Sequence, residues 1–215
     1  MSRHDFIWLA SWPCSGNTLL RTVLWHCFGL KSGSVYPKDL DGNRALERYV
    51  GHASGSELEH LLQHQKPAFI KTHGPPKDHR PAIYVARDGR PACVSFWKFF
   101  KQKLPLTDVI SGKHYFGSWS RNLSAWDPAN RPNTLFLKYE DIERDLDEVL
   151  QRIGAFIECP VLSREIPPRN EIADLGGRHV NQLSDWSEVL QGEALSLFWE
   201  INGDMMKQIY GISGR

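Results

Sequence analysis

The chain has 215 residues, 26 basic and 25 acidic side chains, and a formal net charge of +1. This balance gives no overall positive field of the kind that holds nucleic acid or an anionic membrane, so we expect neither as a partner. An apolar share of 41% is typical of a globular protein with a packed core. We expect one domain that spans residues 1–215.

The cysteines indicate neither a disulfide framework nor a structural metal. Cys14, Cys27, Cys93 and Cys159 are scattered, with no C-x-x-C pair and no histidine at zinc-ligand spacing. The N-terminal apolar run, residues 6–10, is only as long as a strand, which is too short for a signal peptide or a membrane span. We therefore expect a cytoplasmic protein without a metal.

Four short runs rich in β-branched and aromatic residues predict buried strands, at residues 6–11, 68–72, 82–87 and 134–139. Segments with helical spacing lie between or after them, at residues 18–28, 56–65, 91–101, 117–126 and 142–153. This alternation predicts an α/β fold with a doubly wound parallel sheet and helices on both faces. Residues 31–42 and 103–117 form loops long enough to wall or cover a site.

The first predicted strand continues into the sequence Ser-Trp-Pro-Cys-Ser-Gly-Asn-Thr, residues 11–18, which leads directly into a predicted helix. Small residues and Gly16 allow backbone N–H groups to converge on an anion at the helix N-terminus, and Ser15, Asn17 and Thr18 add side-chain donors. The Walker A spacing and its lysine are missing, which disfavours a magnesium-dependent NTPase. The segment predicts a P-loop-like anion site, and an ordinary turn capped by Asn17 or Thr18 is the alternative.

The same loop allows a second chemical interpretation. A thiol phosphatase would use Cys14 as its nucleophile, with an arginine six positions later in the loop. The arginine here is Arg21, one residue beyond that position. Because such a loop must aim its arginine at the phosphate that the thiolate attacks, this misfit disfavours the phosphatase without removing it.

Polar side chains also follow the second and third predicted strands. Lys71 and His73 lie at the end of residues 68–72, where a histidine can accept a proton at neutral pH and a lysine can stabilise a transferring group. Arg87 ends the third strand and Ser95 lies in the helix after it, so the two can hold a second anion. Two anion sites on one sheet edge indicate a ligand with two separated phosphate-like groups.

These segments, in this order, resemble the cytosolic-type sulfotransferases. In that family the phosphosulfate loop reads like Y-P-K-S-G-T-T-W, the base lies in K-T-H, and the 3'-phosphate motif reads like Y-V-x-R-N-P-x-D-x-x-V-S. The likeness continues through residues 117–119, 135–141 and 185–186 and covers nearly the whole chain. It implies a metal-free enzyme that takes 3'-phosphoadenosine 5'-phosphosulfate (PAPS) as co-substrate, sulfates a small-molecule acceptor and releases the bisphosphate PAP.

The resemblance also implies roles for individual residues. His73 would act as general base, and Lys71 would stabilise the transferring group. The other implied contacts are to the nucleotide: Cys14, Ser15, Gly16, Asn17 and Thr18 at the 5'-phosphosulfate, Arg87 and Ser95 at the 3'-phosphate, and Tyr139 and Arg178 beside them. For Tyr139, a purely structural place in the core is an equal alternative.

Two positions depart from the family pattern. Cys14 stands where the family has a lysine that supports the leaving bridging oxygen, and Leu19 stands where it has an aromatic ring that stacks on adenine. A thiol cannot neutralise developing charge, so either Lys71, Arg21 or a loop residue supplies it, or the chain is a catalytically weak PAPS- or PAP-binding protein. Trp12 is an alternative ring for adenine.

Aromatic side chains in the helices and loops above the predicted site suggest a flat or apolar acceptor with a hydroxyl or amine group. About half of them are expected to belong to the core instead. The set comprises Tyr36, Trp97, Phe99, Phe100, Tyr115, Phe116 and Trp119.

Overall fold

The computed structural model describes residues 6–100, 102–168, 171, 175 and 185–214. Within them, parallel strands form one five-stranded sheet in the order β2-β3-β1-β4-β5. The strands are β1 (Phe6–Ala10), β2 (Gly33–Ser34), β3 (Ala68–Thr72), β4 (Ala82–Ala86) and β5 (Thr134–Lys138). The predicted α/β fold with a parallel sheet is confirmed. The sequence missed β2, because two residues are too few to show a pattern of alternation.

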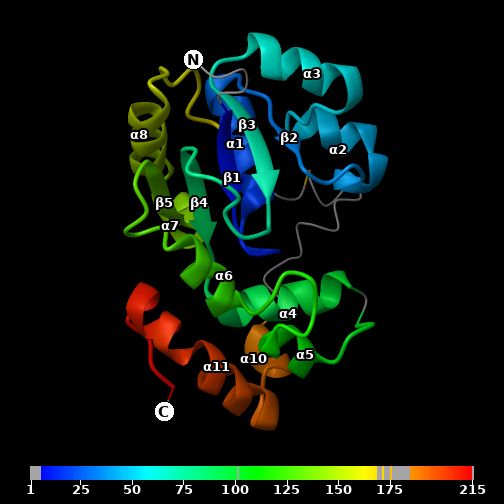
Figure 1. The fold of residues 1–215 in the computed structure, drawn as a ribbon, viewed down its shortest axis with the longest axis vertical. Coiled ribbons are helices and arrows are strands. Elements are labelled where there is room, and N and C mark those ends of the chain that lie inside the picture. Colours follow the sequence, from blue (N-terminus) through cyan, green and yellow to red (C-terminus); the bar gives the residue numbers. More distant parts are fainter. Residues whose placement is uncertain (1–5, 101, 169–170, 172–174, 176–184, 215) are drawn as a thin grey trace.

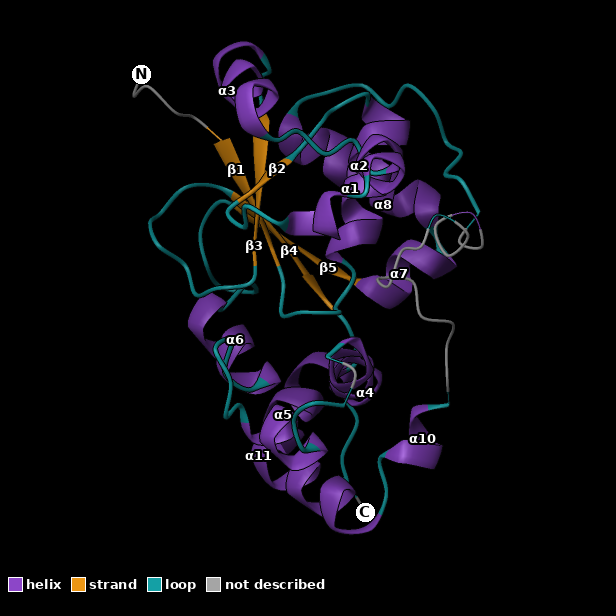
Figure 2. Ribbon diagram, turned by 90° about the vertical axis from the view of Figure 1, so that its right-hand side faces the viewer, coloured by secondary structure: helices purple, strands orange, loops and turns teal. Residues whose placement is uncertain are grey.

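Side chains from alternate positions of the central strand enter two separate cores. Ile7 and Leu9 pack in one core with α1 (Asn17–Phe28) and α8 (Leu146–Ile157). Figure 2 shows these helices together on one side of the sheet.

The other side chains of β1 face the second core. Trp8 and Ala10 pack there with residues of three helices: α4 (Gly89–Phe99), α6 (Trp119–Trp126) and α11 (Gly192–Tyr210). Helices therefore contribute to the cores on both sides of the sheet, in agreement with the predicted α/β fold.

The remaining described helices are η1 (Asp39–Gly42), α2 (Arg44–Tyr49), α3 (Gly55–His64), α5 (Leu106–Ser111), α7 (Tyr139–Arg144) and α10 (Trp186–Val189). The predicted helix at 142–153 is two helices, because Asp145 interrupts it and caps α8 by accepting the Glu148 N–H. Helices α4, α5, α10 and α11 form a layer beyond the carboxyl ends of the strands (Figure 1). None of the described helices is both long and apolar enough to cross a bilayer.

The strand order makes the carboxyl end of β1 the natural place for a ligand. After β1, the chain builds β2 and β3 on one side, then β4 and β5 on the other. Ala10 pairs with Thr72 of β3 and with Tyr84 of β4, so the loops that follow these strands start close together. Such a topological switch point opens a crevice between the loops.

We expect the turn after α5 to depend on a glycine. Gly112 ends that helix in the left-handed conformation, with φ 74°, and a Cβ there would lie 2.1 Å from the backbone nitrogen of Ser118. Gly112→Ala should lower the free energy of unfolding by about 2–4 kcal/mol, since it combines a strained backbone with overpacking. Chemical denaturation measures this loss.

Gly211 provides the matched control. It ends α11 with φ 68°, and a Cβ there would meet nothing within 4 Å. Gly211→Ala should cost only about 1 kcal/mol, from the backbone conformation alone. Equal losses in the two variants would contradict the steric explanation.

Candidate active site

A cavity of about 240 Å³ lies at the carboxyl ends of the strands. It brings together most of the residues that the sequence singled out, although they lie far apart in the chain. Those that line it are Cys14, Gly16, Asn17, Thr18, Lys71, His73, Arg87, Ser95 and Tyr139. Arg178 lies outside the described residues.

The loop after β1 delivers the start of α1 to this cavity. Gly16 adopts φ 104°, and a Cβ there would lie 2.7 Å from Cδ2 of Tyr139, so both the conformation and the packing require glycine. In the part of the chain that the structure describes, no side chain caps this helix. Its first-turn N–H groups can therefore donate to an anion in the cavity.

Two of the predicted side-chain donors in this loop are engaged with the protein instead. The Asn17 amide donates to the Leu9 carbonyl at 3.0 Å and to the Ser11 hydroxyl at 3.3 Å, bracing the loop against β1. Ser15 is fully buried, donates to the Pro13 carbonyl and does not line the cavity. From this loop, the backbone amides and the side chains of Cys14 and Thr18 are then left to contact a ligand.

Cys14 is held as a neutral thiol. It is half-buried in the left-handed conformation, with φ 58°, and its sulfur is hydrogen-bonded to Ser95. Burial raises the pKa of Cys14 to about 11, although the Ser95 hydrogen bond and the charges of Arg87 and Lys71 oppose the rise. Because the thiolate is the nucleophile in thiol chemistry, this environment opposes the phosphatase interpretation. Arg21, the arginine of that hypothesis, does not line the cavity.

Arg87 and Ser95 lie beside the loop, as predicted for a second anion site. The guanidinium carbon of Arg87 lies 4.7 Å from the ring centroid of Tyr139, and its Nη1 donates to the Cys14 carbonyl at 3.4 Å. Trp119 donates from Nε1 to the Arg87 carbonyl at 3.0 Å, which fixes the backbone beneath the guanidinium. This bond anchors the backbone at the strand tip, where the sequence predicted a phosphate contact.

His73 is oriented by its neighbours. Its Nδ1 lies 2.9 Å from the Ser11 carbonyl oxygen and 3.2 Å from the Ser11 hydroxyl. The carbonyl oxygen can only accept, so this shorter contact favours the tautomer with the proton on Nδ1 and leaves Nε2 as the basic nitrogen. The His73 backbone donates its N–H to the Tyr36 hydroxyl at 2.9 Å and accepts from Asn122 at 2.9 Å. The imidazole stacks on Tyr36 and meets the edge of Phe116. Both its tautomer and its position suit a general base.

Asp39 joins Lys71 to Arg21 in a buried charge cluster. Its two carboxylate oxygens lie 2.6 Å from Lys71 Nζ and 2.7 Å from Arg21 Nη1. Burial pushes the pKa of Asp39 upward, but the charges of Lys71 and Arg21 outweigh it and hold the pKa well below its ordinary range. The cluster holds the Lys71 ammonium at the cavity and keeps Arg21 away from it.

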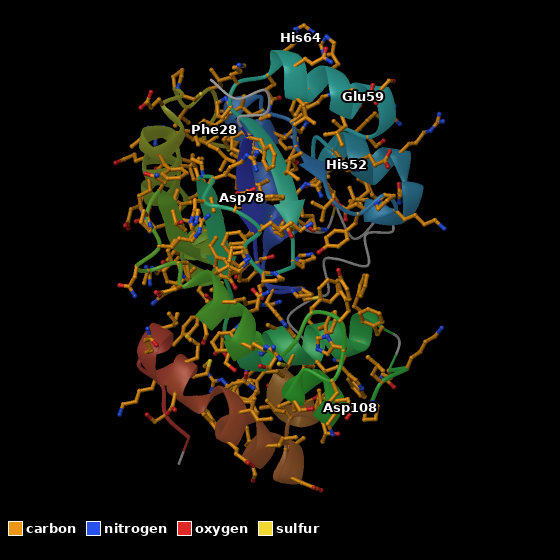
Figure 3. The ribbon with its side chains drawn as sticks, in the orientation of Figure 1. Phe28, His52, Glu59, His64, Asp78 and Asp108 are labelled. Carbon is orange, nitrogen blue, oxygen red and sulfur yellow. The ribbon has the colours of Figure 1, made fainter. Side chains whose placement is uncertain are left out.

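His52 completes the cluster on the far side of Arg21. Figure 3 labels it on the segment between α2 and α3. Arg21 donates to Ser32 at 2.8 Å and reaches His52 Nδ1 at 2.7 Å. Because a guanidinium can only donate, His52 accepts and is neutral. Burial and the Arg21 charge lower the pKa of His52 to about 4.

Aromatic rings form another part of the cavity wall. Of the seven predicted wall residues, four line it: Tyr36, Phe99, Phe100 and Phe116. Trp97, Tyr115 and Trp119 do not, since Trp119 is buried in the core and Tyr115 is 89% exposed. The sequence missed Phe96, which lies in the last turn of α4 and also lines the cavity.

Trp12 cannot supply the ring suggested for adenine. It is fully buried, donates from Nε1 to the Gly117 carbonyl at 2.9 Å and packs against Phe96. Leu19 lines the cavity in the position where an aromatic residue was expected.

The segment after β2 contributes residues that the sequence reasoning missed. Lys38, at the end of the loop, and Asp39 and Leu40, at the start of η1, line the cavity. The available signal was the Tyr-Pro-Lys-Asp sequence at 36–39, which is typical of a turn. This sequence predicts that the chain reverses direction at residues 36–39, but it does not predict which distant residues the turn contacts.

Known proteins share both sequence and fold with this chain. A family model described as the sulfotransferase domain matches residues 4–174. Sulfotransferase 4A1 of Mus musculus is 26% identical over 175 residues, covering 72% of this chain and 60% of that protein. Sulfotransferase 1E1 of Homo sapiens is 28% identical over 182 residues, covering 73% and 60%. The matches thus span 60% of the length of these curated relatives.

Solved structures resemble the fold at lower identity. Retinol dehydratase in a complex with retinol and PAP superposes with a TM-score of 0.66 at 20% identity, over 96% of this chain and 82% of that one. Mouse sulfotransferase SULT7A1 complexed with PAP superposes with a TM-score of 0.62 at 19% identity, over 96% and 86%. The α/β fold is common to all three proteins.

The neutral state of His52 predicts a pH-dependent stability. Since the pKa of His52 is about 4 in the folded protein and 6.5 ordinarily, the unfolded chain binds more protons between these values. The free energy of unfolding should therefore fall as the pH drops from about 6.5 to about 4.

Chemical denaturation across this pH range tests the assignment. In His52→Gln, whose side chain can still accept a hydrogen bond from Arg21, the free energy of unfolding should fall less steeply with decreasing pH. His79→Gln, at an exposed histidine, should keep the wild-type slope; a wild-type slope in His52→Gln would contradict the assignment.

Proposed function

Because the chain belongs to the sulfotransferase domain family, we propose that it moves a sulfuryl group from PAPS to a hydroxyl or amine of a small acceptor. The observation that carries this proposal is a single cavity that contains both an anion-binding loop and an aromatic wall. His73 contacts both, since it hydrogen-bonds Ser11 at the start of the loop and packs on Tyr36 and Phe116. A base in that position can serve an acceptor while the donor occupies the loop.

The donor would be held at two points. We propose that the first-turn amides of α1, Cys14, Gly16 and the Thr18 hydroxyl bind the 5'-phosphosulfate. Arg87 and Ser95 would bind the 3'-phosphate, with Tyr139 supporting the guanidinium. Ser15 and Asn17 would act through the backbone and by bracing the loop, and a nucleotide contact from Arg178 stays a prediction.

Transfer would proceed in line, without a covalent intermediate. The acceptor oxygen or nitrogen attacks sulfur as the bond from sulfur to the bridging oxygen breaks, and the acceptor proton moves to Nε2 of His73. The Ser11 carbonyl, which accepts from Nδ1, stabilises the imidazolium that forms. Lys71, held beside the cavity by Asp39, stabilises the charge on the transferring group.

The acceptor is proposed to be small and at least partly apolar. Five aromatic residues line the cavity, namely Tyr36, Phe96, Phe99, Phe100 and Phe116. Retinol dehydratase, which shares the fold, has been crystallised with retinol and with androsterone. We further propose that residues 1–215 form one domain that works in the cytoplasm, where the free thiols of all four cysteines are stable.

A second candidate function follows from Cys14. If nothing replaces the charge that a lysine would supply, the protein would bind PAPS or PAP and turn it over slowly. Titration calorimetry with PAP, combined with a transfer assay over a panel of alcohols, phenols and amines, separates the two functions. Tight binding without transfer to any acceptor would favour the binding protein.

Replacement of the base should separate chemistry from binding. We expect His73→Ala to lower the rate of transfer by roughly 10²–10⁴-fold, because the acceptor loses its proton acceptor. Its affinity for PAP, measured by calorimetry, should stay close to that of the wild type. His79→Ala, at an exposed histidine outside the cavity, should behave as wild type in both assays. Retained turnover in His73→Ala would sink the assignment.

The 3'-phosphate contact can be tested by comparing two nucleotides. Arg87→Met should weaken PAP binding roughly tenfold or more, since it removes a charge-assisted hydrogen bond. Binding of adenosine 5'-monophosphate, which has no 3'-phosphate, should change far less. Arg121→Met, at an exposed arginine outside the cavity, is the matched control. Equal losses for both nucleotides would contradict the placement of the 3'-phosphate.

A further inference from the structure

The cavity has few charges with which to bind a highly anionic donor. Its lining includes three side chains that are cationic at neutral pH, Lys38, Lys71 and Arg87, and one carboxylate, Asp39. The proposed donor carries a 3'-phosphate and a 5'-phosphosulfate. The inference below rests on that proposed function and concerns which cation serves the 5' end.

Two of the three cations are already engaged. Lys71 is 5% exposed, and its ammonium lies 2.6 Å from Asp39 Oδ1. Arg87 is stacked on Tyr139 and donates to the Cys14 carbonyl, next to Ser95, the other residue of the predicted 3'-phosphate site. Each can still contact a ligand, but the Lys71 charge is partly offset by Asp39, a carboxylate that it shares with Arg21.

The anion-binding loop itself supplies no cation. Its residue at position 14 is a thiol that stays protonated, hydrogen-bonded to Ser95. Arg21, the nearest arginine along the chain, is fully buried and directed at Asp39, Ser32 and His52. The charge that develops on the leaving phosphate therefore needs a group from another element.

Lys38 is held where it can provide that charge. Residues 36–39 form a turn in which the Asp39 N–H donates to the Tyr36 carbonyl at 3.1 Å, with Pro37 and Lys38 at its tip. Both ends are anchored: the Tyr36 hydroxyl accepts from the His73 N–H, and the Asp39 carboxylate bridges Lys71 and Arg21. The tip thus has a fixed position relative to the base.

The Lys38 side chain is also uncommitted. It is exposed, it lines the cavity together with Gly16 and Thr18, and the structure gives its ammonium no hydrogen bond or ion pair within the described residues. A long stem on a fixed turn allows the ammonium to follow a ligand.

We propose that Lys38 is a further catalytic residue of this sulfuryl transfer: its ammonium contacts the 5'-phosphosulfate and takes over the charge that Cys14 cannot supply. As the bond from the acceptor to sulfur forms, the bond from sulfur to the bridging oxygen breaks. The electron pair stays on that oxygen, which becomes an oxygen of the 5'-phosphate of PAP, while the acceptor proton moves to His73. Lys38 remains protonated and stabilises the new negative charge.

Lys38→Met, which keeps the stem and removes the charge, tests the contact. Because PAP retains the leaving oxygen, its affinity reports on Lys38 without any acceptor. Calorimetry should show a roughly tenfold weaker Kd for PAP, and kcat should fall roughly 10²-fold, the loss typical of one removed donor. Lys77→Met, at an exposed lysine that does not line the cavity, should leave both quantities at their wild-type values.

Moving the charge makes the test specific. In the double variant Lys38→Met with Cys14→Lys, a cation returns to the loop, and kcat should recover by roughly tenfold or more relative to Lys38→Met. An unchanged Kd for PAP in Lys38→Met would overturn the proposal. So would a loss confined to the KM of anionic acceptors, since Lys38 would then recognise the acceptor.

The outcomes for this inference and for the proposed function can be told apart. A wild-type protein that binds PAP but sulfates no acceptor would contradict the transferase function, and the PAP affinities of the variants would still decide whether Lys38 contacts the 5'-phosphate. A wild-type protein that binds no PAP would overturn both.

Discussion

The cavity depends on one buried carboxylate. Asp39 forms ion pairs with Lys71 of β3 and Arg21 of α1, and thereby ties the segment after β2 to the strand that precedes His73 and to the helix that follows the candidate anion-binding loop. Burying three charges is costly, and the attraction between them offsets this cost only when the geometry is good and the remaining donors are satisfied. Ser32 and His52 satisfy Arg21, which explains why a histidine is kept neutral at this depth.

This arrangement gives the cavity two different kinds of surface. Backbone amides at the start of α1 can bind an anion without bringing a counter-charge, whereas the rings of Tyr36 and Phe116 make another part of the wall apolar. His73 lies where they meet, because its ring hydrogen-bonds Ser11 and its backbone hydrogen-bonds Tyr36. The loop after β2 thus contributes Tyr36 to the aromatic wall and also holds the backbone of His73, so it links these two parts of the cavity.

The sequence predicted those parts of the site that depend on local chain geometry. Gly16, His73 and Arg87 each follow a strongly apolar strand, and parallel strands bring their carboxyl ends to one edge. It could not predict pairings such as Asp39 with Lys71, 32 residues apart, because nothing near Asp39 indicates its partner. The same limit applies to side-chain direction. Ser15 and Asn17 have the right chemistry for anion binding, yet the tight turn directs their side chains toward the protein.

Cys14 stands where the family pattern has a lysine, and the consequence depends more on where another cation lies than on the residue type at position 14. A cation stabilises a developing negative charge according to their separation and the local dielectric, whichever element carries it. A loop lysine lies beside the phosphate with little freedom, whereas Lys38 has a long flexible side chain whose ordering costs up to about 2 kcal/mol. Anchoring the turn at Tyr36 and Asp39 reduces the backbone part of that cost, so the same ion pairs that fix Lys71 also position Lys38. In this protein the electrostatics of the anion-binding loop thus depend on a neighbouring turn, and the buried carboxylate connects the two.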